Sequence, residues 1–123
     1  MDAFLRIIEI LAGFYYFVFG VDGFFKKIPL PVPSENAQQF LAAIEKTKYI
    51  LFTVKLVEII VGIMWVLGYK SGLAWLLFTP IWFNILGYHF LINKKEKALP
   101  LGILLIHLIL ALKNREFIWQ LFQ

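Results

Sequence analysis

The chain has 123 residues, of which 61% are hydrophobic and 16% are charged. Soluble domains are about 45–50% apolar, so this composition indicates a membrane protein with a single domain, residues 1–123. The absence of cysteine excludes thiol and disulfide chemistry and Cys-bound iron–sulfur or zinc centres. The net charge of +4 comes from basic residues between apolar runs, where they meet lipid headgroups, so we expect no nucleic-acid partner.

The first predicted membrane span covers residues 4–25. Its apolar run is longer than that of a signal peptide, and no small-residue cleavage site follows it, so we interpret it as a permanent helix. The next segment must end this helix, because prolines that alternate with other residues favour an extended path. This segment holds Lys26, Lys27, Pro29, Pro31 and Pro33.

A short amphipathic helix is predicted after the prolines, with Ser34 placed to cap its N-terminus. Its apolar residues recur at i, i+3, i+4 and i+7: Ala37, Phe40, Leu41 and Ile44. A helix of this kind lies on the bilayer surface. Lipid anchoring is its more frequent role, and a lid over the bundle or a docking surface is the alternative.

Two further spans, residues 49–69 and 73–92, have the roughly 20 residues needed to cross about 30 Å of hydrocarbon. Small residues on the first span and on one face of the second allow helices to approach closely in the membrane, which predicts a tight four-helix bundle. These residues are Gly13, Gly20 and Gly23 on the first span and Gly62 on the second. On the third span, a 3-4 repeat indicates a packed helix face. It consists of Pro80, Asn84, Gly87 and Leu91.

The last apolar stretch would cover only about 22 Å, so we expect its helix to extend over residues 98–119. Lys113 and Arg115 would then reach towards headgroups. A tail that lies on the surface after Asn114 is the alternative. The predicted fold is all-α: a transmembrane four-helix bundle with a short amphipathic helix between the first and second spans.

Basic residues are unequally divided between the two sides of this bundle. Seven lie at the side of the two longer loops: Lys26, Lys27, Lys46, Lys48, Lys94, Lys95 and Lys97. Four lie at the other: Arg6, Lys70, Lys113 and Arg115. Because Lys and Arg concentrate in cytoplasmic loops, the bias predicts that both termini are outside.

Polar residues within the spans mark the candidate site. A rise of about 1.5 Å per residue places Glu58, Asn84 and His107 about 13–14 Å below the lysine-rich edge, with Lys55 and His89 at about 9 and 6 Å. An ionisable group in hydrocarbon costs about 2.5–3.5 kcal/mol and normally faces a bundle interior. We therefore take these five residues as ligand-binding candidates and expect no metal. The alternative is structural, with interhelical hydrogen bonds and a local Lys55–Glu58 pair.

Other chemistries are poorly supported. The two serines lie in loops, and no Ser-His-Asp arrangement or phosphate-binding loop is present, which argues against a hydrolase. His89 and His107 differ in depth by about 8 Å, against the equal placement that two axial haem ligands prefer.

Residues between Gly20 and Asn93 form a pattern seen in a known family. They are Gly20, Gly23, Lys26, Lys27, Pro29 to Pro33, Phe40, Tyr49, Glu58, Gly62, Pro80, Asn84, His89 and Phe90. This pattern resembles that of DoxX-like proteins, small four-helix proteins of the bacterial inner membrane. The resemblance implies the same fold and membrane, and matches Glu58 and the Asn84-to-Phe90 segment to family positions. At His107 an acidic residue is more usual in the family.

Some members of that family are membrane subunits of quinone-linked oxidoreductases, such as the thiosulfate:quinone enzyme. Others are proposed to assemble with superoxide dismutase and sulfurtransferase partners. The absence of cysteine argues against the disulfide-handling relatives. The resemblance therefore implies an accessory subunit of an oxidoreductase rather than a self-contained enzyme.

We predict an integral membrane subunit of a redox or quinone-linked complex, in which Glu58, Asn84 and His89 line a pocket for a quinone headgroup or a similar polar-tipped lipid. His or Glu would exchange protons with the ligand, and Asn would hydrogen-bond its carbonyl. One alternative is a non-catalytic assembly or anchoring protein with a structural polar core. Another is a small transporter or proton conduit that uses Lys55 and Glu58. The expected partners are the lipid bilayer and a protein subunit or a second copy.

Overall fold

The computed structural model describes residues 2–94 and 97–123. Lys95, one of the lysines counted for orientation, lies outside the described residues. The described chain folds into helices α1 (Asp2–Phe25), α2 (Glu35–Thr47), α3 (Ile50–Leu67), α4 (Ser71–Gly87), the π-helix η1 (Tyr88–Ile92), α5 (Ala98–Lys113) and α6 (Arg115–Gln120). The predicted all-α class is confirmed for these residues.

Among the described residues, three helices are long and apolar enough to cross a membrane: α1, α3 and α4 together with η1. They correspond to the first three predicted spans and indicate a membrane protein. The fourth apolar helix, α5, has 16 residues and covers about 24 Å, less than the roughly 30 Å of the hydrocarbon core. A complete fourth span is therefore not established.

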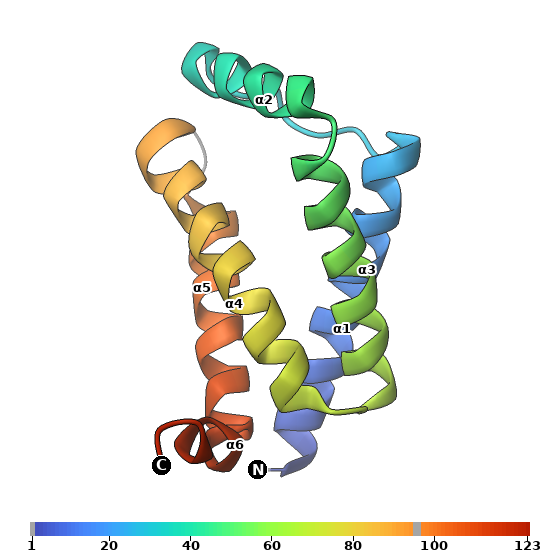
Figure 1. Cartoon of the computed structure of the whole chain (residues 1–123), viewed down its shortest axis with the longest axis vertical. Coiled ribbons are helices and arrows are strands. Elements are labelled where there is room, and N and C mark those ends of the chain that lie inside the picture. The colour runs from blue at the N-terminus through green and yellow to red at the C-terminus, as the bar shows by residue number, and fades with distance from the viewer. Residues whose placement is uncertain (1, 95–96) are drawn as a thin grey trace.

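The predicted continuous helix over residues 98–119 is wrong, because α5 ends at Lys113 and a separate helix, α6, follows. The break lies at Asn114, as in the alternative of a turned tail. The Asn114 side-chain amide donates to the Leu110 carbonyl at 2.9 Å and to Ser71 Oγ at 3.1 Å. A side chain that binds a backbone carbonyl in this way competes with continuation of the helix. Figure 1 shows α6 turned out of line with α5.

The four long helices form two pairs, α1 with α3 and α4 with α5 (Figure 1). Within the first pair, a Cβ atom built on Gly62 would lie 2.7 Å from the Gly13 carbonyl oxygen, which no side chain allows. Gly20 packs against Ile59, and Gly23 packs against the aliphatic part of Lys55. These glycines lie at close helix contacts, as predicted, and the structure identifies α1 and α3 as the two helices involved.

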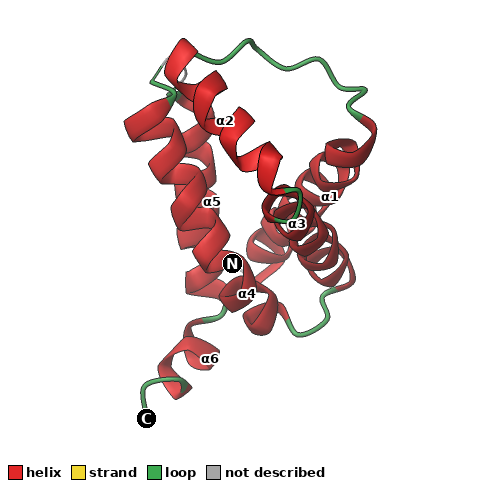
Figure 2. Cartoon of the chain, turned by 45° about the horizontal axis from the view of Figure 1, so that its top comes forward, coloured by secondary structure: helices red, strands yellow, loops and turns green. Residues whose placement is uncertain are grey.

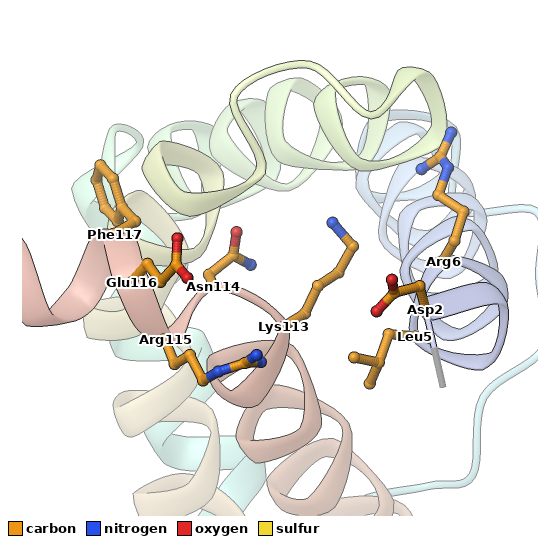
Figure 3. A pocket seen from close by; sticks show the side chains of 8 residues that line it. All are labelled: Asp2, Leu5, Arg6, Lys113, Asn114, Arg115, Glu116 and Phe117. Carbon is orange, nitrogen blue, oxygen red and sulfur yellow. The ribbon is translucent and has the colours of Figure 1, made fainter.

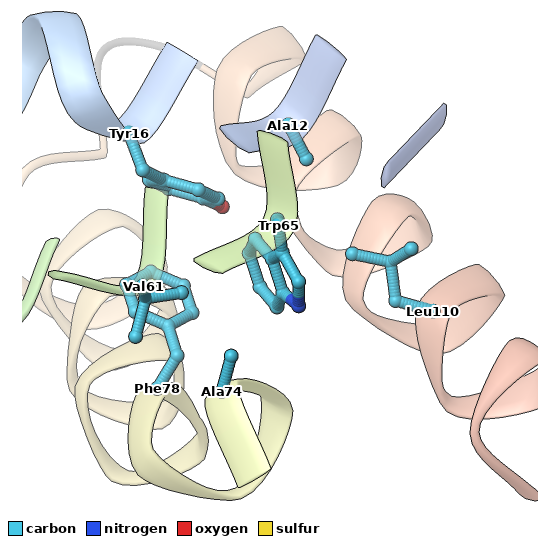
Figure 4. Close-up of a cluster of buried hydrophobic side chains, with 7 residues drawn as sticks. All are labelled: Ala12, Tyr16, Val61, Trp65, Ala74, Phe78 and Leu110. Carbon is cyan, nitrogen blue, oxygen red and sulfur yellow. The ribbon is translucent and has the colours of Figure 1, made fainter. Parts of the chain in front are cut away.

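A buried cluster joins the two pairs near the end of the molecule where both termini lie (Figures 1 and 4). All four long helices contribute to it: Ala12, Tyr16, Val61, Trp65, Ala74, Phe78 and Leu110. The Tyr16 and Phe78 rings are 4.4 Å apart, and the Trp65 and Phe78 rings are 6.0 Å apart. Aromatic contacts of this type stabilise beyond the area that they bury. The two pairs diverge from this cluster towards α2.

Helix α2 crosses the opposite end of the molecule (Figure 2). Ser34 caps it as predicted, since Ser34 Oγ accepts a hydrogen bond from the Ala37 amide at 3.3 Å. The Ser34 amide in turn donates to Asn93 Oδ1 at 3.2 Å, and the Phe40 ring lies 5.8 Å from that of Tyr88. The amphipathic helix is thereby fastened to the end of η1.

Candidate functional site

Glu58 and Lys55 form an ion pair on one face of α3. The Glu58 carboxylate is buried, and its Oε2 lies 3.3 Å from Lys55 Nζ. Because Lys55 and Glu58 are three residues apart, the pair is neutralised within one helix turn. This is the local pairing that the structural alternative predicts.

His107 lies buried in the interface between α4 and α5. Its ring is stacked between Trp75 and Trp82, with ring centres 4.8 and 4.6 Å away. Its Nε2 lies 2.9 Å from Thr79 Oγ1, and the Trp75 indole donates to the His107 carbonyl at 3.0 Å. The imidazole is enclosed by aromatic rings and has a hydrogen-bond partner, so its contacts serve to hold α4 against α5.

Asn84 and His89 occupy different surroundings from Glu58. Asn84 is exposed on α4, and its amide donates to the Pro80 carbonyl of its own helix at 2.8 Å. His89 is half-buried in η1, with its ring 4.9 Å from that of Tyr88. The expected convergence of Glu58, Asn84 and His107 is not present, because each has separate partners. Equal depth along a helix axis does not fix the direction in which a side chain points.

A cluster of charges that the sequence analysis did not assign lies at the end of the molecule near the termini. Glu9 is completely buried, and its carboxylate is 2.5 Å from Arg6 Nη1 and 3.3 Å from Lys113 Nζ. The Arg6 guanidinium also donates to the carbonyls of Trp65 and Val66 at 2.6 and 2.7 Å. These contacts fasten α1 to the last turn of α3 and to the end of α5. Cations at these two helix ends are also favoured by the helix dipoles.

The signal for this cluster was present in the sequence as an acidic residue inside an apolar helix. Glu9 lies on the same face of the first span as Gly13 and Tyr16. Its partner Lys113 is more than a hundred residues away in the chain, and from the sequence alone Lys113 is one of the charges that predict membrane orientation. Only the packing of α1 against α5 shows that the two side chains pair.

A pocket of about 550 Å³ opens beside these charges, between the start of α1 and the junction of α5 with α6 (Figure 3). Its lining carries three cationic and two acidic side chains together with apolar and amide groups. The lining residues are Asp2, Leu5, Arg6, Lys113, Asn114, Arg115, Glu116 and Phe117. The Arg6 and Lys113 side chains are 37% and 27% exposed, so both charges lie at the surface of this pocket rather than in the interior.

A second hollow of about 530 Å³ lies between α1 and α5, and its exposed lining is almost wholly apolar. It is lined by Ile8, Leu11, Ala12, Tyr15, Tyr16, Ala98, Leu99, Gly102, Ile103 and Ile106. We call it the α1–α5 groove. A Cβ atom on Gly102 would meet nothing within 4 Å, so this residue leaves open space in the groove wall.

The charged pocket and the α1–α5 groove follow one another along the same two helices. Leu5 lines the pocket and Ile8 lines the groove, and residues three apart share a helix face. On α5, Lys113 likewise lines the charged pocket and Ile106 lines the groove. A charged pocket and an apolar groove, each of a size typical for small-molecule sites, thus lie in succession along α1 and α5. This arrangement suits a molecule with a polar head and an apolar tail.

In comparisons with known proteins, no family model, curated protein or solved structure matches this chain. The resemblance to DoxX-like proteins therefore stays a prediction from the residues quoted above.

Proposed function

We propose that this chain is an integral membrane subunit that binds a quinone or a similar polar-tipped lipid. The apolar tail would occupy the α1–α5 groove, and the polar head would lie in the charged pocket at its end. The observation that carries this proposal is that the two hollows follow one another along α1 and α5. The site differs from the predicted one around Glu58 and Asn84, whose own role in ligand binding stays a prediction.

The head of the ligand would meet both hydrogen-bond donors and hydrogen-bond acceptors. Arg6, Lys113 and Arg115 present guanidinium and ammonium groups, which bind carbonyl or phosphate oxygens by charge-assisted hydrogen bonds. Asp2 and Glu116 can accept hydrogen bonds from hydroxyl groups or take up a proton at the same place. The carbonyl oxygen of a quinone would accept hydrogen bonds from the cationic groups, and the hydroxyl group formed on reduction would donate to the carboxylates.

The redox part of the proposal rests on the resemblance to membrane subunits of quinone-linked oxidoreductases. The chain contains no cysteine, so electrons would come from a partner subunit. In this proposal the chain is an accessory subunit in the bacterial inner membrane, and the ligand links it to the partner's chemistry. A partner at the end that holds both termini would lie next to the charged pocket.

The test fills the groove without disturbing a packed contact. Gly102→Leu introduces a side chain into open space in the groove wall, whereas Gly87→Leu adds the same bulk on α4, also in open space but outside the groove. Both changes remove a helix-destabilising glycine, so neither should unfold the protein. Lipids that co-purify with each variant in mild detergent are then extracted and quantified by mass spectrometry.

We expect the unaltered protein and Gly87→Leu to retain one lipid species in near-stoichiometric amount, and Gly102→Leu to lose most of it. A retained quinone would support the redox-linked function, and a retained phospholipid would support lipid binding while contradicting the quinone. Equal lipid retention by both variants, or no bound lipid in the unaltered protein, would refute the groove as a binding site.

A structural role is the second candidate for the polar residues within the spans. It is favoured by the contacts of Lys55, Glu58 and His107, since each already has a partner within the protein. In this case the chain would be an assembly or anchoring protein whose polar core fixes helix packing. Glu58→Gln would then lower stability and leave lipid retention unchanged.

A further inference from the structure

One face of α4 and η1 is apolar, exposed and regularly spaced. The 3-4 repeat found in the sequence extends along the whole segment and points outward, away from α5. Its members are Leu73, Leu77, Pro80, Asn84 and Leu91, which are exposed, and Gly87, which is half-buried. We call these six residues the α4 stripe. In the most apolar part of the Ser71–Ile92 segment only 6% of residues are buried within the chain, against 33% for α1. The spacing is that of a helix that packs against another helix.

Asn84 is the polar residue of the α4 stripe and lies about 12 Å from the end of η1 at Ile92, near mid-membrane. Among the described residues, its amide nitrogen donates one hydrogen bond, to the Pro80 carbonyl, and its oxygen accepts none. In hydrocarbon, no water is present to satisfy the remaining donor and acceptor, and an unsatisfied polar group is costly. The amide therefore needs a partner from outside this chain.

Gly87 lies one helix turn from Asn84 in the same stripe and provides space for that partner. A Cβ atom built on Gly87 would meet nothing within 4 Å. By contrast, Gly13 and Gly62 are filled by the backbone of the opposing helix. Glycine in a membrane helix allows another helix to approach closely. At Gly87 such an approach is open and unused within the chain.

We propose that two copies of this chain associate through their α4 stripes, with Asn84 of each copy hydrogen-bonded to Asn84 of the other. Two copies inserted in the same direction and related by a two-fold axis along the membrane normal place every α4 residue at the depth of its own counterpart. An amide carries both a donor and an acceptor, so it is complementary to itself. A different partner would need its own polar group at that depth, whereas a second copy supplies one by symmetry.

The absence of cysteine allows a direct test in native membranes or nanodiscs. Single cysteines are placed at the two ends of the stripe, by Leu73→Cys and Leu91→Cys, and a matched control, Leu101→Cys, is placed on an exposed position of α5. We expect oxidation to cross-link the two stripe variants as dimers and to leave the control monomeric. Cross-linking of the control as readily as the stripe variants, or no dimer in either stripe variant, would overturn the proposal.

The role of the amide is tested in the Leu91→Cys background by adding Asn84→Leu. Asn84 is exposed and its substitution opens no cavity, so the fold should persist, which a circular dichroism spectrum confirms. We expect the dimer dissociation constant, measured by dilution of protein in lipid, to rise about tenfold, the effect of a membrane hydrogen bond of about 1.4 kcal/mol. Adding Gly87→Leu instead should also weaken the dimer and, unlike Gly102→Leu, leave lipid retention intact. An unchanged dissociation constant in both variants would refute this interface.

Discussion

Gly62→Ala should destabilise the α1–α3 pair, although alanine is the better helix former. The new Cβ atom would lie 2.7 Å from the Gly13 carbonyl oxygen and 2.7 Å from the Phe17 amide nitrogen, whereas ordinary contact begins at 3.4 Å. Both neighbours are backbone atoms, which cannot rotate away as a side chain can. The helices must therefore separate by a distance of about 0.7 Å along this contact.

The magnitude follows from two opposing effects. Overpacking of a close contact costs about 1–3 kcal/mol, and a contact with backbone atoms belongs at the upper end of that range. Replacing a helical glycine by alanine contributes about 1 kcal/mol in the opposite direction. We expect a net loss of about 2 kcal/mol in the free energy of unfolding.

The measurement is a reversible unfolding titration with sodium dodecyl sulfate in mixed micelles, followed by circular dichroism. Gly102→Ala is the matched control, because its Cβ would meet nothing within 4 Å. The control should be as stable as the unaltered protein or more stable by up to about 1 kcal/mol. Equal stability of Gly62→Ala and the control would contradict the close backbone contact between α1 and α3 at Gly62.

Three further predictions follow from the contacts at both ends and in the middle of the molecule. Glu9→Ala should lower the free energy of unfolding by about 1–3 kcal/mol, less than for a fully buried pair because both cations are partly exposed. Combining it with Lys113→Ala in the same titration should cost less than the sum of the two single changes, and simple additivity would contradict the pairing. His107→Ala should cost about 2–4 kcal/mol by leaving a gap between two tryptophan rings, and unchanged stability would show that this stacking is unimportant. Ser34→Ala should cost about 1 kcal/mol confined to α2, seen as faster hydrogen exchange of its amides, and equal acceleration in α3 would show that the cap is not local.

Local sequence signals predicted the parts of the fold that depend on neighbouring residues. Ser34 and the 3-4 periodicity after it defined α2, because a cap and an apolar face are properties of one short segment. Gly13 and Gly62 indicated close helix packing for a similar reason, since glycine in a membrane helix allows another helix to approach, although they did not show that α1 and α3 are the pair. These elements could be read without knowing the rest of the structure.

The candidate site was harder to predict, because it depends on rotation about each helix and on which helices are neighbours. Glu58 and Asn84 have similar depth, but α3 packs mainly against α1 and the Asn84 face of α4 points outward. The depth of a residue in the membrane follows from counting residues along its helix. The direction in which its side chain points can be used only when the neighbouring helices are known. Glu9 shows the same limit, since its partner Lys113 becomes a neighbour only when α1 packs against α5.

The two helix pairs meet around Trp65 and Phe78 and are linked at the other end mainly through α2. Each pair holds together through its own contacts, glycine against backbone in one and tryptophan against imidazole in the other. A change in the angle between the pairs would therefore pivot on the aromatic cluster and leave both intact. The protein therefore consists of two rigid helix pairs that share a hinge, and we expect opening and closing of the angle between the pairs to be its lowest-energy motion.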